Sequence, residues 1–392
     1  MTIAITGGTV VPVTSDMIEN GVVIIEGNKI KAVGGSDTKI PDGATIIDAS
    51  GKWVTPGFID AHSHISTMNE PQAMPSALSS QDGNEMISPN TCYIRAIDAL
   101  NPADPAVETA RKAGFTTCCT LPGSANIIGG TSIVFKTLKG STIFDLVIEG
   151  SEQMKMALGE NPKRVYGNDK KAPMTRMGNA AVLREALYNA KVYADAIKEG
   201  KKDPSKAPKP DFKLDPLVPV IEGKMRCRIH SHRADDIVTA IRICKEFGLK
   251  FSIEHCTEGY KILDYLKAND VTAIVGPLTM GPMKMEIWGT KLETPGLMEG
   301  AGVNFCLTED SASGIKYLPT HIGYAIARGL SRKAAFEAVT IRPAKLLDVD
   351  KRVGSLEKGK DADVAIFTDF PFSNLALCDT TIINGEVYKN LD

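Results

Sequence analysis

Five of the six histidines in this sequence fall in three short clusters, each following an apolar run. His62-Ser63-His64 and His230-Ser231-His232 are His-x-His pairs, and His255 follows Glu254. Side chains on a strand alternate in direction, so both imidazoles of a His-x-His pair point to the same side. Neutral imidazole is a preferred ligand of zinc and related ions. The clusters therefore predict a metal site rather than separate hydrogen-bonded histidines.

The elements that must position these clusters are short strands that alternate with helices. The clearest helix is Asp235 to Phe247, whose apolar residues share one face. Repeated β-then-α order predicts parallel strands, and eight such units predict an α/β fold closed into a (β/α)8 TIM barrel. Such barrels place functional side chains at the C-terminal ends of the strands, where the histidine clusters lie. The expected strands are residues 57–60, 115–120, 132–136, 153–157, 225–230, 250–254, 272–275 and 303–307.

Both ends of the chain are rich in short apolar runs separated by turns, such as Gly27-Asn28. We expect residues 1–55 and 351–392 to pair into one small composite β-sandwich domain, with residues 56–350 forming the barrel. Two polar stretches interrupt the barrel pattern. Ser66 to Asn90 follows the first strand and is predicted to be an active-site lid. Lys201 to Pro216 is predicted to be a solvated surface loop.

The composition is that of an ordinary globular protein, with 43% hydrophobic and 23% charged residues and a net charge of -2. This balance gives no electrostatic field that would recruit nucleic acid or an anionic membrane. No apolar run is long enough to span a bilayer, and the N-terminal segment has no secretory signal, so we expect a cytoplasmic protein. The eight cysteines form no CxxC pair and are expected to be free buried thiols. The expected partners are a small-molecule substrate and further copies of the chain in a homo-oligomer.

Two longer motifs resemble those of a known superfamily. Pro56-Gly57-Phe58-Ile59-Asp60-Ala61-His62-Ser63-His64 resembles the signature that opens the barrel of the amidohydrolase superfamily. Gly359-Lys360-Asp361-Ala362-Asp363-Val364-Ala365-Ile366 is similar to the phrase with which its chains re-enter the small β domain. Within the superfamily the chain resembles the imidazolonepropionase-like and prolidase-like branch. The resemblance implies a composite β domain, a metal-binding barrel and hydrolysis by a metal-activated water.

The resemblance also implies a ligand set. His62 and His64 match the strand-one ligands, His230 the strand-five ligand and His255 the strand-six ligand. Lys155 lies where many members carry a carboxylated lysine that bridges two metals. A buried, unpaired ammonium would be costly, although a lysine at a strand end can also extend its ammonium to solvent. We expect a divalent-metal cofactor of two Zn²⁺ per chain.

Strand eight should end in an aspartate that binds metal and acts as general base. Asp310-Ser311 resembles the usual pair, whereas an ungapped count back from Tyr317-Leu318-Pro319 favours Glu309. We favour Asp310, because its side chain is short and Ser311 follows it. Neighbours on a strand point in opposite directions, so only one of the two should face the metal.

Residues predicted to bind substrate follow strands two, four and five. His232 lies two residues beyond a ligand, on the same strand face. Arg164, Tyr166 and Arg176 follow strand four and could hold a substrate carboxylate, since an arginine binds one through two parallel hydrogen bonds. Asn126 lies in a glycine-rich turn. His321, at the start of a helix, is expected to be structural.

The preferred function is hydrolysis of a carbon–nitrogen bond in a small amide, cyclic amide or dipeptide-like substrate, more in keeping with non-peptide amidases than with peptidases. One alternative is a one-metal deaminase of the same superfamily. Such enzymes carry a Glu three residues after the strand-five histidine, and this chain has Arg233 there. The other alternative is a non-catalytic assembly protein, which degraded ligand positions would mark; here the histidine set is complete.

Overall fold

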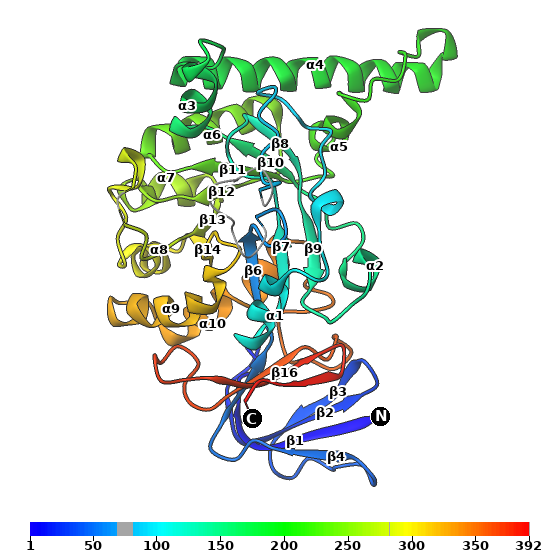
Figure 1. The fold of residues 1–392 in the computed structure, drawn as a ribbon, viewed down its shortest axis with the longest axis vertical. Coiled ribbons are helices and arrows are strands. Elements are labelled where there is room, and N and C mark those ends of the chain that lie inside the picture. The colour runs from blue at the N-terminus through cyan, green and yellow to red at the C-terminus, as the bar shows by residue number, and fades with distance from the viewer. Residues whose placement is uncertain (69–80, 282, 392) are drawn as a thin grey trace.

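One sheet contains strands from both ends of the chain. The structure is a computed structural model that describes residues 1–68, 81–281 and 283–391. The strands of this terminal sheet are β1 (Thr2–Val10), β2 (Ile18–Glu26), β3 (Lys29–Gly34), β4 (Thr45–Asp48), β5 (Trp53–Pro56), β15 (Val364–Phe367), β16 (Cys378–Ile383) and β17 (Glu386–Lys389). They pair in the order β17-β16-β15-β5-β1-β2-β3, with β4 on β1. Figure 1 shows both termini at this end of the molecule.

The terminal sheet buries the apolar residues of its alternating strands. Ile3 and Ile5 of β1 pack with Ile25 of β2 and with Val364 and Ile366 of β15 in one core cluster. Alternation of side chains along each strand places these residues on the same face. Strand β15, from the C-terminal part of the chain, lies antiparallel to β5 from the N-terminal part. The two ends of the sequence therefore share one hydrophobic core.

The middle of the chain is an α/β fold built on a second set of strands. All but the strand at residues 128–131, which has no predicted counterpart, start and end within a few residues of the predicted ones. The strands of this set are β6 (Phe58–Ser63), β7 (Phe115–Thr120), β8 (Ile128–Thr131), β9 (Ile133–Lys136), β10 (Met154–Ala157), β11 (Cys227–Ser231), β12 (Phe251–His255), β13 (Thr272–Val275) and β14 (Asn304–Leu307). Strands β10 to β14 are parallel to one another, as is the pair β6 and β7. Among the described residues the strands form two sheets, β14-β13-β12-β11-β10-β8 and β6-β7-β9.

The third predicted strand runs in the opposite direction from the prediction. Strand β9 lies antiparallel to β7, and β8, just before it, lies antiparallel to β10. Only residues 121–127 separate β7 from β8. A crossover to a parallel neighbour needs a dozen or more residues, so this connection can only reverse the chain. The expectation of uniformly parallel strands was wrong here.

Helices cover the middle strands, and the predicted helix from Asp235 is α6, with its apolar residues Ile237, Ala240, Ile241 and Cys244 buried. Gly248, in the left-handed conformation that glycine adopts readily, ends it. The helices are α1 (Pro105–Lys112), α2 (Ile143–Leu146), α3 (Glu160–Asn168), α4 (Arg176–Lys202), α5 (Val218–Ile221), α6 (Ala234–Phe247), α7 (Leu263–Ala268), α8 (Thr294–Ala301), α9 (Leu318–Ala327), α10 (Arg332–Ala338) and α11 (Ile341–Leu346). Helix α4 lies at the end of the molecule away from the terminal sheet (Figure 1).

The two polar stretches have different outcomes. Residues 69–80 of the predicted lid lie outside the described residues. The described residues after them pack on the turn that follows β7: Gly83 O accepts from Gly123 N at 2.6 Å, and Asn84 Oδ1 accepts from Ala125 N at 2.9 Å. In the predicted loop from Lys201 to Pro216, α4 extends through Lys202, and most of the residues that follow are exposed.

A buried lysine joins the two parts of the fold. Lys136 at the end of β9 donates through Nζ to Asp361 Oδ2 at 2.6 Å, to Asp363 Oδ1 at 3.0 Å and to Asn384 Oδ1 at 2.6 Å. Both aspartates belong to the motif that resembles the re-entry phrase, so the acidic residues of this motif satisfy a buried ammonium. Burial without such partners would be costly.

All eight cysteines are free and buried, which confirms the prediction of unpaired thiols. Within the described ranges, no helix combines the length and apolar character needed to cross a bilayer.

Candidate metal centre

The candidate site lies where the middle strands end. His62 lies near the C-terminal end of β6, His230 near that of β11, and His255 is the last residue of β12. Asp310 follows the end of β14. A cavity of about 190 Å³ opens at this place, and His230, His232 and Asp310 are among its lining residues. The structure therefore brings together side chains that are up to about 250 positions apart in the sequence.

The ring of His62 is held by a buried ion pair. Its Nδ1 lies 2.5 Å from Oε2 of Glu254, and Arg228 donates to both oxygens of this carboxylate, at 2.6 and 2.8 Å. Burial opposes ionisation of Glu254, but the Arg228 guanidinium and His62 hold its pKa well below the usual range. The ionised carboxylate accepts the proton of Nδ1, so Nε2 is the ring nitrogen of His62 that faces the site.

Arg228 and Glu254 belong to no motif that was recognisable in the sequence. Both lie inside apolar strands, Arg228 on β11 and Glu254 on β12, and both are fully buried. A charged residue in such a run is costly to bury unless it is paired. That cost was the signal available in the sequence.

Backbone carbonyls orient His64 and His255 in the same way. Nδ1 of His64 lies 2.9 Å from Leu121 O, and Nδ1 of His255 lies 2.9 Å from Gly276 O. A carbonyl only accepts, so both Nδ1 atoms carry the proton and both Nε2 atoms carry the lone pair. Burial lowers the pKa of both rings, that of His255 to about 3, so they are neutral at pH 7.

The carbonyl that orients His255 requires a glycine. Gly276 has a φ of +149°, and a Cβ built on it would lie 1.9 Å from Thr308 O. No other residue type fits at this position without moving the backbone, because the contact is with a backbone atom. The close approach fixes the carbonyl that holds the His255 ring.

Lys155 is buried beside His62. It lies on β10, is 1% exposed, and its Nζ is 3.2 Å from Nε2 of His62. Burial lowers the pKa of its amine to about 8. Carbamate formation requires a neutral amine, and a lysine in this environment supplies one at far lower pH than an exposed lysine does.

The neighbours Glu309 and Asp310 point in different directions. Oδ1 of Asp310 lies 3.2 Å from Nε2 of His62 and 3.1 Å from Nε2 of His64. Glu309 instead contacts His321, with 2.8 Å between its Oε2 and the His321 Nδ1. Asp310 has a φ of +53°, an uncommon backbone conformation for a residue other than glycine and one often found at functional sites.

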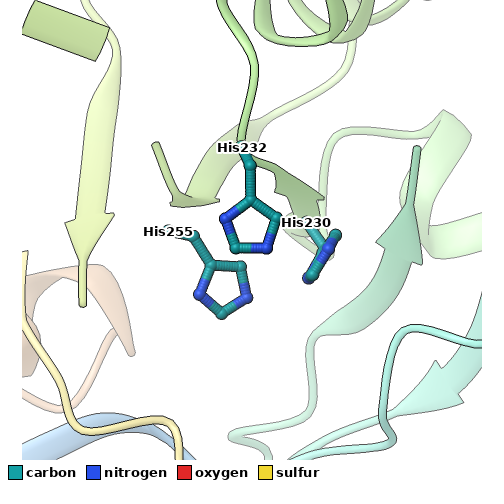
Figure 2. A group of neighbouring side chains, drawn as sticks. All are labelled: His230, His232 and His255. Carbon is teal, nitrogen blue, oxygen red and sulfur yellow. The ribbon is translucent and has the colours of Figure 1, made fainter. Parts of the chain in front are cut away.

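A second group consists of three histidines from two adjacent strands. Figure 2 shows the rings of His230, His232 and His255 gathered in one place. One ring nitrogen of each lies within 4.8 Å of the others, as do the ligand atoms of His62, His255 and Asp310. Burial lowers the pKa of His230 and His232 well below the usual range, so both are neutral. Both groups have the chemistry of a divalent-metal site.

The loop after β13 contributes two charged residues that sequence analysis did not single out. Glu286 is 2% exposed, and its Oε1 lies 3.8 Å from Nε2 of His230 and 3.9 Å from Nε2 of His232. Lys284 lines the cavity and donates to Glu286 Oε1 at 2.8 Å and to Asn161 Oδ1 at 3.3 Å. The loop sequence Met283-Lys284-Met285-Glu286 has no helix or strand periodicity from which the position of Lys284 and Glu286 at the site could be predicted.

Two of the predicted substrate-binding residues contact each other. Tyr166 Oη lies 2.5 Å from Asn126 Oδ1 and 2.6 Å from Ser88 O. The amide nitrogen of Asn126 donates to Glu85 O at 2.8 Å and to Thr91 Oγ1 at 2.7 Å. Neither side chain is among the residues that line the cavity in the described structure. Their contacts join the turn before β8 and helix α3 to residues 85–91.

The two predicted arginines also lie away from the cavity lining. Arg176, the first residue of α4, contacts Asp236 with Nε–Oδ distances of 3.1 and 3.0 Å, and its Nη2 is 3.9 Å from Glu286 Oε2. Arg164 lies exposed on α3. Of the residues predicted to bind substrate, His232 is the one that lines the cavity.

Comparison with known proteins relates most of this chain to one group of enzymes. The amidohydrolase family model matches residues 221–388. The crystal structure of an amidohydrolase from Thermotoga maritima MSB8 is 34% identical, covers 99% of this chain and 100% of its own, and superimposes with a TM-score of 0.92. Imidazolonepropionase of Fusobacterium nucleatum subsp. nucleatum is 25% identical over 418 residues, covering 96% of this chain and 92% of its own. Amidohydrolase tasK of Hapsidospora irregularis is 25% identical over 381 residues, 91% of this chain but 38% of that protein, so the chain spans well under half of this relative.

Proposed function

Because the chain belongs to the amidohydrolase superfamily, we propose that it is a metal-dependent hydrolase of a carbon–nitrogen bond in a small amide, cyclic amide or dipeptide-like substrate. One observation carries the proposal. The carboxylate of Asp310 meets Nε2 of His62 and of His64 at 3.2 and 3.1 Å, beside the buried amine of Lys155. An oxygen and two imidazole nitrogens at this spacing form the mixed donor set that divalent zinc binds.

The donor atoms fit a pair of divalent ions, for which zinc is the proposed identity. Nε2 of His230 and Oδ1 of Asp310 are buried and, among the described residues, have no well-aligned hydrogen-bond partner, so a bound cation would satisfy both atoms. When bound, such ions would supply a water nucleophile at neutral pH and polarise the scissile carbonyl. The proposed ligands are His62, His64, Lys155 as its carbamate, His230, His255 and Asp310.

Asp310 is the proposed general base. Its side chain is 20% exposed, so one edge reaches the cavity where water and substrate enter. It would accept the proton of the attacking water and return that proton to the leaving nitrogen, a role in which a positioned carboxylate is effective. Glu309 instead forms an ion pair or hydrogen bond with His321, and not with His62 or His64.

The proposed substrate carries a carboxylate that Lys284 binds. The Lys284 ammonium has three N–H donors, and its contacts with Glu286 and Asn161 leave one for a ligand in the cavity. Met280, Pro277 and Ile287 line the same cavity and would contact the apolar part of a small substrate. In this proposal Lys284 binds the substrate carboxylate, the role predicted from the sequence for Arg164 and Arg176.

We also propose that β6 to β14 form the wall of one barrel. Support comes from the gap between β14 and β6, where Thr308 Oγ1 donates to Asp60 Oδ1 at 2.7 Å and lies 2.6 Å from His62 O. In this proposal residues 56–350 form the barrel domain, and residues 1–55 with 351–392 form a β-sandwich domain. The proposed assembly in solution is a homo-oligomer, which the molar mass of the native protein would test.

Metal analysis combined with a substrate screen tests the function. Protein purified without chelator should contain on the order of two divalent ions per chain. It should hydrolyse members of a panel of N-acyl amino acids, dipeptides, lactams and hydantoins, and chelation should abolish that activity. Full activity after complete removal of metal would refute the proposal.

A reproducible content of one ion per chain, together with release of ammonia from an amino-substituted ring, would instead indicate the deaminase alternative. The residue in the position of the deaminase glutamate, Arg233, contacts Asp235 at 2.8 Å near the surface. A cation at this position does not supply the proton transfers that a carboxylate supplies.

A further inference from the structure

We propose that His232 is itself a metal ligand, so that the second metal position is built from the three imidazoles of His230, His232 and His255. The inference rests on the proposed function and extends it, because the ligand set argued above uses only the first and third of these rings at that position. The expected occupant is a divalent ion of borderline softness such as Zn²⁺ or Co²⁺.

The three rings already stand at nearly equal distances from one another. The ring centroids are 4.5 Å apart for His230 and His232, 4.5 Å for His230 and His255, and 4.6 Å for His232 and His255. One nitrogen of each lies within 4.8 Å of the other two. Zinc–nitrogen bonds in a tetrahedral site place the nitrogens roughly 3.3 Å apart. Small rotations of the side chains therefore suffice to close the group on an ion.

In two of the three rings the second nitrogen has a hydrogen-bond partner, which leaves the other nitrogen for the metal. His255 Nδ1 donates to Gly276 O, and His232 Nδ1 lies 2.8 Å from Thr257 Oγ1. Nε2 of His230 is buried and has no hydrogen-bond partner among the described residues. Metal-binding histidines characteristically use their second nitrogen in such a hydrogen bond.

The backbone explains why His232 joins this group. His230 and His232 lie two positions apart at the end of β11, so both rings emerge on one side. His255 ends β12, the next strand, opposite Ser231. Regular alternation would turn its ring to the other face, but its φ of +66° departs from strand geometry, and the ring lies beside the other two. The third imidazole is thus placed by the same strand pair that places the other two.

The surroundings suit a cation site whose side-chain nitrogen ligands are three imidazoles. A divalent ion held by the three rings adds two positive charges to a buried place. Glu286, 3.8 and 3.9 Å from Nε2 of His230 and His232, supplies a negative charge beside it. Imidazole ligands favour zinc, cobalt and nickel over magnesium and manganese, which prefer oxygen. A position built from three imidazoles should therefore select against Mg²⁺ and Mn²⁺.

The test measures binding of Co²⁺ and Zn²⁺ to the full-length His232→Ala protein by chelator competition, together with the visible spectrum of the Co²⁺ form. We expect the affinity at one of the two metal positions to fall by more than roughly 100-fold, beyond the 10- to 100-fold typical for a residue that only orients a ligand. The cobalt spectrum should change, and added imidazole should restore both affinity and spectrum by filling the vacated space.

Thr257→Val is the matched control, because it removes the hydrogen-bond partner of His232 but keeps the ring. It should lose at most roughly 100-fold in affinity, without rescue by imidazole. Far-UV circular dichroism and thermal unfolding of the apo proteins verify that the variants fold. His232→Ala protein that binds Co²⁺ with unchanged affinity and spectrum, but with a raised KM, would overturn the inference and make His232 a substrate contact. Wild-type protein that binds no metal would contradict the proposed function itself.

Discussion

Glu254 Oε2 lies 2.5 Å from Nδ1 of His62, and the same carboxylate receives both arms of the Arg228 guanidinium. One buried acid thus neutralises an arginine of β11 and orients a histidine of β6. A histidine is a good metal ligand only when its second nitrogen is correctly protonated. The contact between Glu254 and His62 should therefore affect the metal affinity of the site.

Replacing Glu254 with Gln should weaken metal binding and stability together. We expect a 10- to 100-fold loss of metal affinity, and a loss of about 3–5 kcal/mol in the free energy of unfolding because Arg228 keeps a buried charge without its partner. Chelator competition and denaturant unfolding measure the two effects. Glu258→Gln is the control: Glu258 contacts the exposed Lys261, and loss of a surface pair changes little. Equal behaviour of the two variants would contradict the assignment.

Asp310→Asn and Glu309→Gln form a second matched pair. Asp310→Asn should lower kcat by roughly 10²- to 10⁴-fold, because the amide cannot accept the proton of the attacking water. Glu309→Gln should retain more activity, since Glu309 contacts His321 rather than the histidines of the site. Metal content of both proteins is the necessary control. If Glu309→Gln were inactive and Asp310→Asn turned over normally, the two assignments would have to be exchanged.

Lys155→Ala should lose metal and activity together if a carbamate bridges the ions. Small carboxylic acids such as acetate should restore part of both, because a carboxylate can stand in for the missing carbamate. Metal content and turnover are measured with and without the acid. An active, fully metallated Lys155→Ala protein would show that Lys155 is not a bridging ligand.

Lys284→Met should raise KM for substrates that carry a carboxylate by roughly 10- to 150-fold, which corresponds to the 1.5–3 kcal/mol of a hydrogen bond to a charged group. Lys284→Arg should recover much of the loss. The same substrates with the carboxylate converted to an amide serve as the control, and their KM should respond little. A uniform effect on charged and neutral substrates would mean that Lys284 acts through Glu286 instead.

Asp361→Asn should destabilise the protein more than Asp363→Asn. Asp361 contacts Lys29 at 2.7 Å, Lys136 at 2.6 Å and Arg352 at 2.9 Å. Burial opposes its ionisation, but these cations lower its pKa overall, whereas burial raises the pKa of Asp363. Removing the charge of Asp361 should cost about 3–5 kcal/mol, as for other broken buried ion pairs. Denaturant unfolding of both variants measures the difference, and an equal loss would contradict the argument.

The sequence allowed the strands and the clustered histidines to be predicted, because both depend on local patterns. Apolar runs placed the middle strands within a few residues, and the His-x-His spacing put two imidazoles on one face. The direction of β9 was not predictable from its own residues, since its apolar run would suit a parallel strand equally well. The length of the connection between β7 and β8 decides the direction, because seven residues are too few for a crossover to a parallel strand.

Pairings between distant residues were out of reach for a different reason. Arg228 meets Glu254 because β11 and β12 align His230 with Glu254, a register that no local pattern specifies. Tyr166 was predicted to bind substrate because its type and position suit that role. In the structure its hydroxyl faces Asn126, the other residue predicted beside it. Residue type indicated polarity correctly, but only the three-dimensional arrangement identifies the partner.

The Lys136 ion cluster bears on the order in which the chain assembles. Asp361 lies 225 positions after Lys136, and Asn384 lies further still. A chain that folds during synthesis has made β9 long before either residue leaves the ribosome. Until they arrive, the ammonium at the end of β9 must stay hydrated, and the interior around it stays wet. Completion of the core around Lys136 in the nascent chain therefore waits for the segment that carries Asp361 and Asn384.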